Sequence, residues 1–114
     1  MISFACKTIN FEDLVRCSFD FNKTEFKIFI FLLSKKEPLC VSTIADALSK
    51  DRTTVQKAMK QLLDKEIVFK HQVNLEGGGY SYLYKIKDKD YIKEKLLNIV
   101  NGWSKQVINY IDKW

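Results

Sequence analysis

Residues 42–68 read STIADALSKDRTTVQKAMKQLLDKEIV, and they contain two helical patterns joined by a short polar turn. The first pattern has three apolar residues at the spacing of one helix face: Ile44, Ala45 and Leu48. Ser42 stands where an N-cap is expected for this helix, and Asp51 can cap the second helix over residues 52–65. The stretch therefore predicts a helix-turn-helix unit.

The second helix has two chemically different faces. At 100° per residue, one face collects apolar side chains, Val55, Met59, Leu62 and Leu63. The opposite face collects Thr53, Gln56, Lys57 and Lys60. Between residues 50 and 60, four cations stand against the single carboxylate of Asp51: Lys50, Arg52, Lys57 and Lys60. A helix that enters the major groove of DNA needs such outward basic and hydrogen-bonding groups. The alternative interpretation of this polar face is that it is simply exposed to solvent, as in an ordinary amphipathic helix.

The flanking sequence predicts the other elements. Residues 9–18 form a first short helix, and Asn22 with Glu25 makes a capping-box pattern that begins a second, aromatic-rich one. Pro38 ends that helix and introduces a short extended piece. Residues 67–75 and 80–86 read as two strands joined by EGGG. The last pattern is a single helix from about residue 90 to residue 114, which would be about 37 Å long.

Composition narrows the class of protein. A chain of 114 residues with 46% apolar and 29% charged residues predicts a single soluble domain over 1–114. No apolar run approaches the roughly 20 residues of a membrane span, and no secretory signal is visible, so a cytoplasmic protein without membrane contact is expected. The net charge of +5 mildly favours an anionic partner.

The cysteines and the single histidine predict neither a metal site nor a cofactor. Cys6, Cys17 and Cys40 form no CxxC pair, and His71 is far from all three in the sequence. We expect reduced thiols that mostly pack as small apolar groups, while a redox-sensing role for one of them stays an open alternative. The triple glycine lacks the Lys-Ser/Thr of a nucleotide-binding loop, and no enzyme is predicted.

The order of helices followed by a strand pair and a long helix resembles a known family. The motifs NKTEFKIFIFLL, VSTIADALSKDRTTVQKAMKQLLDKEIV and GGGYSYLYKI, within residues 22–86, are similar to those of the archaeal TrmB-like regulators, relatives of the MarR-type repressors. The resemblance implies a mainly α (α+β) winged helix-turn-helix fold. We expect an N-terminal region over 1–21, a DNA-binding core over 22–88 and a dimerisation helix over 89–114. Glu66 departs from the family, which often has glycine there.

The resemblance also implies which residues contact duplex DNA. Arg52, Thr53, Thr54, Gln56, Lys57 and Lys60 would face the groove, with Lys50 nearby in the turn. Ser42 and Thr43 would touch phosphate. Lys70 and Lys85 lie near the base of the predicted wing, and Glu76 makes its tip acidic, so direct insertion of the tip into a phosphate-lined groove is disfavoured.

The C-terminal helix has an apolar stripe that suits pairing with a second copy. Its members are Ile92, Leu96, Ile99, Val100, Trp103, Val107, Tyr110, Ile111 and Trp114. In the family, terminal helices build homodimers, and residues 1–18 would pack alongside. A dimer could place two recognition helices about 34 Å apart, as a palindromic site requires.

The leading hypothesis is a homodimeric, sequence-specific transcription regulator, most simply a repressor. The alternatives are a winged-helix module that contacts protein in a transcription assembly, and a nonspecific DNA-coating protein. The sequence specifies neither an operator nor a small-molecule effector.

Overall fold

The computed structural model describes all residues from Met1 to Trp114. Its contacts divide the chain into two compact units, which are described separately below. One unit is the continuous segment Asn22–Lys87. The other combines Met1–Phe21 with Asp88–Trp114, so the two ends of the chain belong to one unit.

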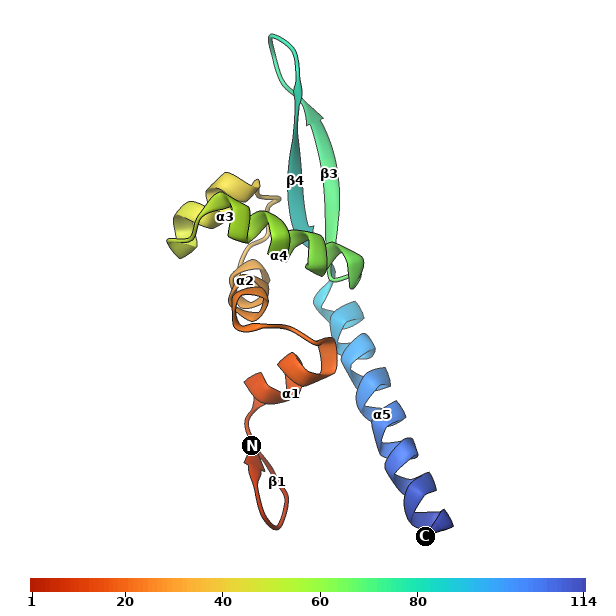
Figure 1. Cartoon of the computed structure of the whole chain (residues 1–114). Helices are drawn as coiled ribbons and strands as arrows, with labels where there is room; N and C mark the ends of the chain where they lie inside the picture. The colour runs from red at the N-terminus through yellow and green to blue at the C-terminus, as the bar shows by residue number, and fades with distance from the viewer. The chain divides into compact units, whose positions relative to one another are not determined.

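The segment Asn22–Lys87 begins with three helices, coloured orange to green in Figure 1: α2 (Lys23–Leu33), α3 (Val41–Leu48) and α4 (Arg52–Asp64). The predicted capping box is confirmed at the start of α2, where the Asn22 side chain accepts from the Glu25 backbone N–H at 2.8 Å. In return, a carboxylate oxygen of Glu25 accepts from the Asn22 backbone N–H at 3.2 Å. The predicted cap of α4 is also confirmed, since the Asp51 side chain accepts from the Thr54 N–H.

The expected N-cap at Ser42 is wrong by two residues. Cys40 is the N-cap, with extended backbone and no side-chain cap hydrogen bond, and Ser42 lies within the first turn of α3. The reason is visible just upstream, where Leu39 exchanges two backbone hydrogen bonds of 2.8 and 2.7 Å with Tyr84. This bridge holds the chain extended through Leu39, so the helix starts directly after it.

The predicted hairpin is present as β3 (Val68–Asn74) and β4 (Tyr80–Ile86), paired antiparallel from Val68↔Ile86 to Asn74↔Tyr80. The connecting glycines 77–79 all have positive φ angles, which side chains rarely adopt. Strand β4 reaches the core only near its base, where Tyr84 is 2% exposed, whereas Tyr80 near the tip is 58% exposed.

Helix α4 carries much of the core of this segment. Val55, Met59 and Leu62 are 0% exposed, as the helical pattern predicted, whereas Leu63 is half-buried. Other helices and the base of the hairpin supply further fully buried side chains: Ile28, Leu32, Ile44, Ile67 and Val68. The core thus fixes which face of α4 is turned away from solvent.

The carboxyl end of α4 closes in the manner of a glycine-terminated helix, although no glycine is present. Glu66 has a φ of 62°, its N–H donates to the Leu63 carbonyl at 3.0 Å, and the Ile67 N–H donates to the Leu62 carbonyl at 2.9 Å. These two bonds define a Schellman motif, and Ile67 and Leu62 are both 0% exposed, as its apolar contact requires. Glu66 therefore adopts the conformation in which the family's glycine would be unstrained.

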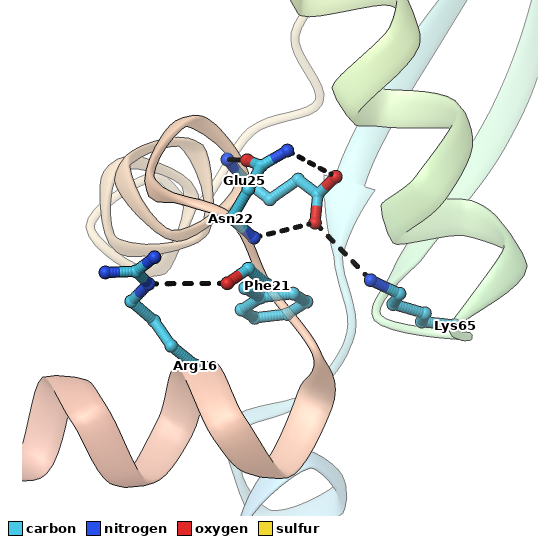
Figure 2. A network of polar contacts seen from close by, with 5 residues as sticks. All are labelled: Arg16, Phe21, Asn22, Glu25 and Lys65. Atoms are coloured by element: carbon cyan, nitrogen blue, oxygen red, sulfur yellow. Dashed lines mark hydrogen bonds and ion pairs between the residues drawn. The ribbon is translucent and has the colours of Figure 1, made fainter.

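The unit of the two chain ends contains α1 (Phe11–Phe19) in contact with α5 (Lys89–Lys113). Asn10 caps α1, and Val15, Phe19, Phe21 and Ile92 are buried. Phe11, the first residue of α1, is 64% exposed. The Arg16 Nε donates to the Phe21 carbonyl at 3.3 Å, as Figure 2 shows.

A short hairpin of β1 (Ile2–Ser3) and β2 (Thr8–Ile9) precedes α1 and was not predicted. Elsewhere the expected architecture is confirmed: mostly helical, with a two-stranded wing and a long C-terminal helix, which is a winged helix-turn-helix arrangement. None of these helices is both long enough and apolar enough to cross a membrane.

Candidate DNA interface

The outward face of α4 presents the polar residues that the sequence singled out. All of the following are exposed: Arg52, Thr53, Gln56, Lys57 and Lys60. Their opposite neighbours on the helix are the core residues Val55, Met59 and Leu62, so the packing of α4 holds this face toward solvent. No hydrogen bond or salt bridge within the chain engages the side chains of Arg52, Gln56 or Lys60. These groups are available to a partner.

Thr54 is held differently from its neighbours. It is half-buried, and its hydroxyl donates to Asp51 Oδ1 at 2.5 Å, while its backbone N–H donates to Asp51 Oδ2 at 3.1 Å. These two bonds favour the carboxylate form and lower the pKa of Asp51. Thr54 thus organises the first turn of α4, and its hydroxyl already donates its proton to Asp51 rather than to a partner.

The amino end of α3 contains the expected phosphate-contacting pair. Thr43 is exposed and Ser42 is half-buried, and Ser42 lies within the first turn rather than at the cap. The Thr43 hydroxyl lies 3.2 Å from Cys40 Sγ, and this hydrogen bond lowers the pKa of the Cys40 thiol. Lys50 follows the left-handed residue Ser49 in the turn, where its N–H donates to the Ala45 carbonyl at 3.0 Å.

The two wing lysines lie on opposite faces of the hairpin. In the register, Lys70 pairs with Tyr84 and Lys85 pairs with Phe69, and neighbouring pairs in a strand ladder face opposite sides. The Lys70 ammonium lies 4.1 Å from the centre of the Tyr82 ring. A flat surface against one side of the wing can therefore meet Lys70 or Lys85, but not both.

Helix α2 contributes residues beside α4 that sequence reasoning missed. A hollow of about 560 Å³ lies between its amino end and α4, lined by Asn22, Thr24, Glu25, Thr54, Lys57, Ala58, Lys60 and Gln61. Thr24 and Gln61 were not among the expected site residues. The capping box located the start of α2 correctly, but only the packing of α2 on α4 places that start next to Lys57.

Glu25 forms the buried wall of this hollow, with an exposure of 6%. Besides its capping-box bond, it accepts from the Asn22 side-chain amide at 3.1 Å and pairs with the Lys65 ammonium at 3.4 Å (Figure 2). Lys65 thus compensates the charge of Glu25, and Asn22 supplies it with hydrogen bonds.

The stripe on α5 is more exposed in the second half of the helix than in the first. Ile92 is buried at 5%, Leu96, Ile99 and Val100 are half-buried, and Trp103 is 55% exposed. The last members remain open to solvent: Val107, Tyr110, Ile111 and Trp114. Leu97 and Ile108, at 60% and 52%, add to the exposed apolar surface of this helix.

Comparisons with known proteins agree with this architecture. Residues 15–90 match the family described as the sugar-specific transcriptional regulator TrmB. Two proteins of Methanocaldococcus jannaschii are similar in sequence: MJ1503 is 29% identical over all of this chain and 83% of its own length. MJ1082 is 31% identical over 92% of this chain and 86% of its own length.

Solved structures are similar as well. A possible transcriptional regulator from Methanosarcina mazei Go1 matches with a TM-score of 0.94 and 33% identity, over 100% of this chain and 96% of its own. A Staphylococcus aureus MepR mutant bound to an oligodeoxyribonucleotide has a TM-score of 0.59 at 16% identity, over 86% of this chain and 71% of its own, which is a likeness of fold alone. The family match and the fold support DNA-binding regulation. The chain belongs to the TrmB family of transcriptional regulators.

Proposed function

We propose that this protein is a sequence-specific regulator of transcription that binds double-stranded DNA as a homodimer and acts as a repressor. The observation that carries the proposal is the exposed, unpartnered polar face at the amino-terminal half of α4. Arg52 and Gln56 are there, and their side chains can form paired hydrogen bonds with guanine and adenine. Membership of a family of transcriptional regulators supports the proposal that α4 contacts DNA.

The packing of α4 makes it a suitable reading element. Val55, Met59 and Leu62 on its apolar face are fully buried in the core, and Asp51 fixes its first turn. A helix that is fixed by both its core packing and its cap can present side chains to base edges without a large entropic cost on binding. The net charge of +5 favours approach to DNA, and phosphate contacts would add affinity that weakens with salt.

Helix α5 supports the dimer. The half of the helix from Trp103 onward exposes four further apolar members of the stripe that nothing in the chain covers. Burial of such a surface against a second copy would stabilise the pair by about 25 cal/mol per Å² of apolar area before the cost of association. A two-fold dimer presents two copies of α4, and it would occupy a palindromic site and block access of the transcription machinery.

Selection of binding sites from a random pool of duplexes tests the proposal, because the pool contains every short operator sequence. The expected result is enrichment of a motif with two inverted half-sites whose centres lie about 10 base pairs, or one helical turn, apart. Enrichment of a single half-site would contradict the dimer. If the protein retained DNA but no motif was enriched, sequence specificity would be contradicted. If the protein retained no DNA, a module that contacts protein would be favoured instead.

A further inference from the structure

The hollow between α2 and α4 has a composition suited to an anion. Its α4 side carries the exposed lysines Lys57 and Lys60, and its α2 side carries Thr24, with a volume of about 560 Å³ between them. Neither lysine forms a salt bridge within the chain. The hollow is therefore lined by Thr24 and by two lysines that form no salt bridge. The carboxylate of Asp51 attracts Lys57 electrostatically without pairing with it.

The one carboxylate in the wall does not oppose binding of an anion. Glu25 is buried and accepts three hydrogen bonds, two from Asn22 and one from the Lys65 ammonium, which also compensates its charge. Figure 2 shows both Glu25 oxygens directed toward these donors. The charge left facing the hollow is thus that of the two lysines on α4. The backbone N–H of Thr24, in the first turn of α2, is a further donor without an acceptor in the helix.

We propose that this hollow receives a backbone phosphate of the DNA that α4 reads, with Thr24, Lys57 and Lys60 as its donors. The inference rests on the proposed function and divides the polar surface of α4 into two parts. Arg52, Thr53 and Gln56 face bases. Lys57 and Lys60, which the sequence assigned to groove reading, instead position the duplex through its backbone.

The location of the hollow supports DNA rather than a separate anion. Lys57 and Lys60 belong both to the exposed face of α4 and to the wall of the hollow. A helix lying in the major groove has a phosphate strand along each of its sides, and contacts to phosphate fix the register while base contacts supply specificity. An element packed beside such a helix, as α2 is packed beside α4, is in position to meet one of those strands.

The test uses the chain of 114 residues, two charge-matched variants on α2, the variant Lys57→Gln on α4 and two short duplexes. Thr24→Glu places a carboxylate in the hollow. It also puts an acidic group in the first turn of a helix, which favours folding, so the variant should remain folded. Lys27→Gln makes the same change of net charge at an exposed position of α2 outside the hollow. One duplex carries the sequence obtained by site selection, and the other is scrambled.

Loss of one phosphate contact lowers the slope of log affinity against log salt by about 0.9, which corresponds to about fivefold in affinity at 0.15 M salt. We expect Thr24→Glu and Lys57→Gln each to lose at least this factor on both duplexes. Lys27→Gln should lose less than about twofold, because its charge is distant and screened.

Two results would overturn the inference while leaving the proposed function intact. One is a Thr24→Glu variant that binds as well as Lys27→Gln. The other is a Lys57→Gln variant that loses affinity only for the selected duplex, since that behaviour belongs to a base contact. If the unaltered chain binds neither duplex, the proposed function fails and the inference fails with it.

Discussion

Replacement of Glu66 by glycine should stabilise the protein, although it removes a side chain. Glu66 is the left-handed residue of the Schellman motif that ends α4, with a φ of 62°. A residue with a Cβ is strained there, because its Cβ crowds the following carbonyl oxygen, whereas glycine is not. The motif leads directly into β3, so its geometry also sets where the wing begins.

The size of the effect follows from two opposing terms. Relief of the left-handed strain contributes about 1–2 kcal/mol in favour of glycine. The greater freedom of glycine in the unfolded chain offsets about 0.4–1 kcal/mol of this. The net gain is about 0.5–1 kcal/mol. With an unfolding entropy of about 2.1 cal/mol/K per residue over 114 residues, this raises Tm by roughly 2–4 °C.

The comparison that isolates the backbone is Glu66→Gly against Glu66→Ala. Both variants lose the same carboxylate and its interactions, and they differ only at Cβ. Urea and thermal unfolding, at one protein concentration, should give Glu66→Gly the higher free energy of unfolding. Equal stability of the glycine and alanine variants at residue 66 would refute the strain argument.

Four other changes probe the core, the reading face, the cap and the dimer. Leu62→Ala, at a 0% exposed site, should cost about 2–5 kcal/mol in urea unfolding. Arg52→Ala should weaken binding to a selected duplex by about 1–3 kcal/mol and leave scrambled DNA nearly unaffected, as anisotropy titrations would report. The hydrogen bonds from Thr54 lower the pKa of Asp51, so the unaltered protein should lose free energy of unfolding relative to Asp51→Asn as the pH falls through that lowered pKa. Parallel curves of unfolding free energy against pH for the two proteins would contradict this. Trp103→Glu should halve the particle mass in light scattering; an unchanged mass would count against pairing through α5.

Local sequence signals predicted most of the fold because each has a nearby physical cause. Asn22 with Glu25 and Asp51 with Thr54 are contacts within one helical turn, and they specify where α2 and α4 begin. The periodicity of Val55, Met59 and Leu62 similarly specified the buried face of α4. The DNA-reading role of the opposite face stays a prediction.

The features that were missed depend on contacts between distant parts of the chain. The start of α3 is set by the bridge of Leu39 to Tyr84, 45 positions away, so Ser42 alone misplaced the cap. The hollow beside Thr24 exists only through the packing of α2 on α4. The opposite orientation of Lys70 and Lys85 follows from the hairpin register.

Fluorescence anisotropy is the most direct test of the central claim. The full chain would be titrated onto duplex DNA from the region upstream of its own gene and onto a scrambled duplex, each at two salt concentrations. A sequence-specific regulator should bind tightly, with an affinity that falls steeply with salt, and should prefer the upstream duplex. Equal affinity for the two duplexes would contradict sequence-specific regulation at that site, and absence of binding to both would contradict a DNA-binding function for α4.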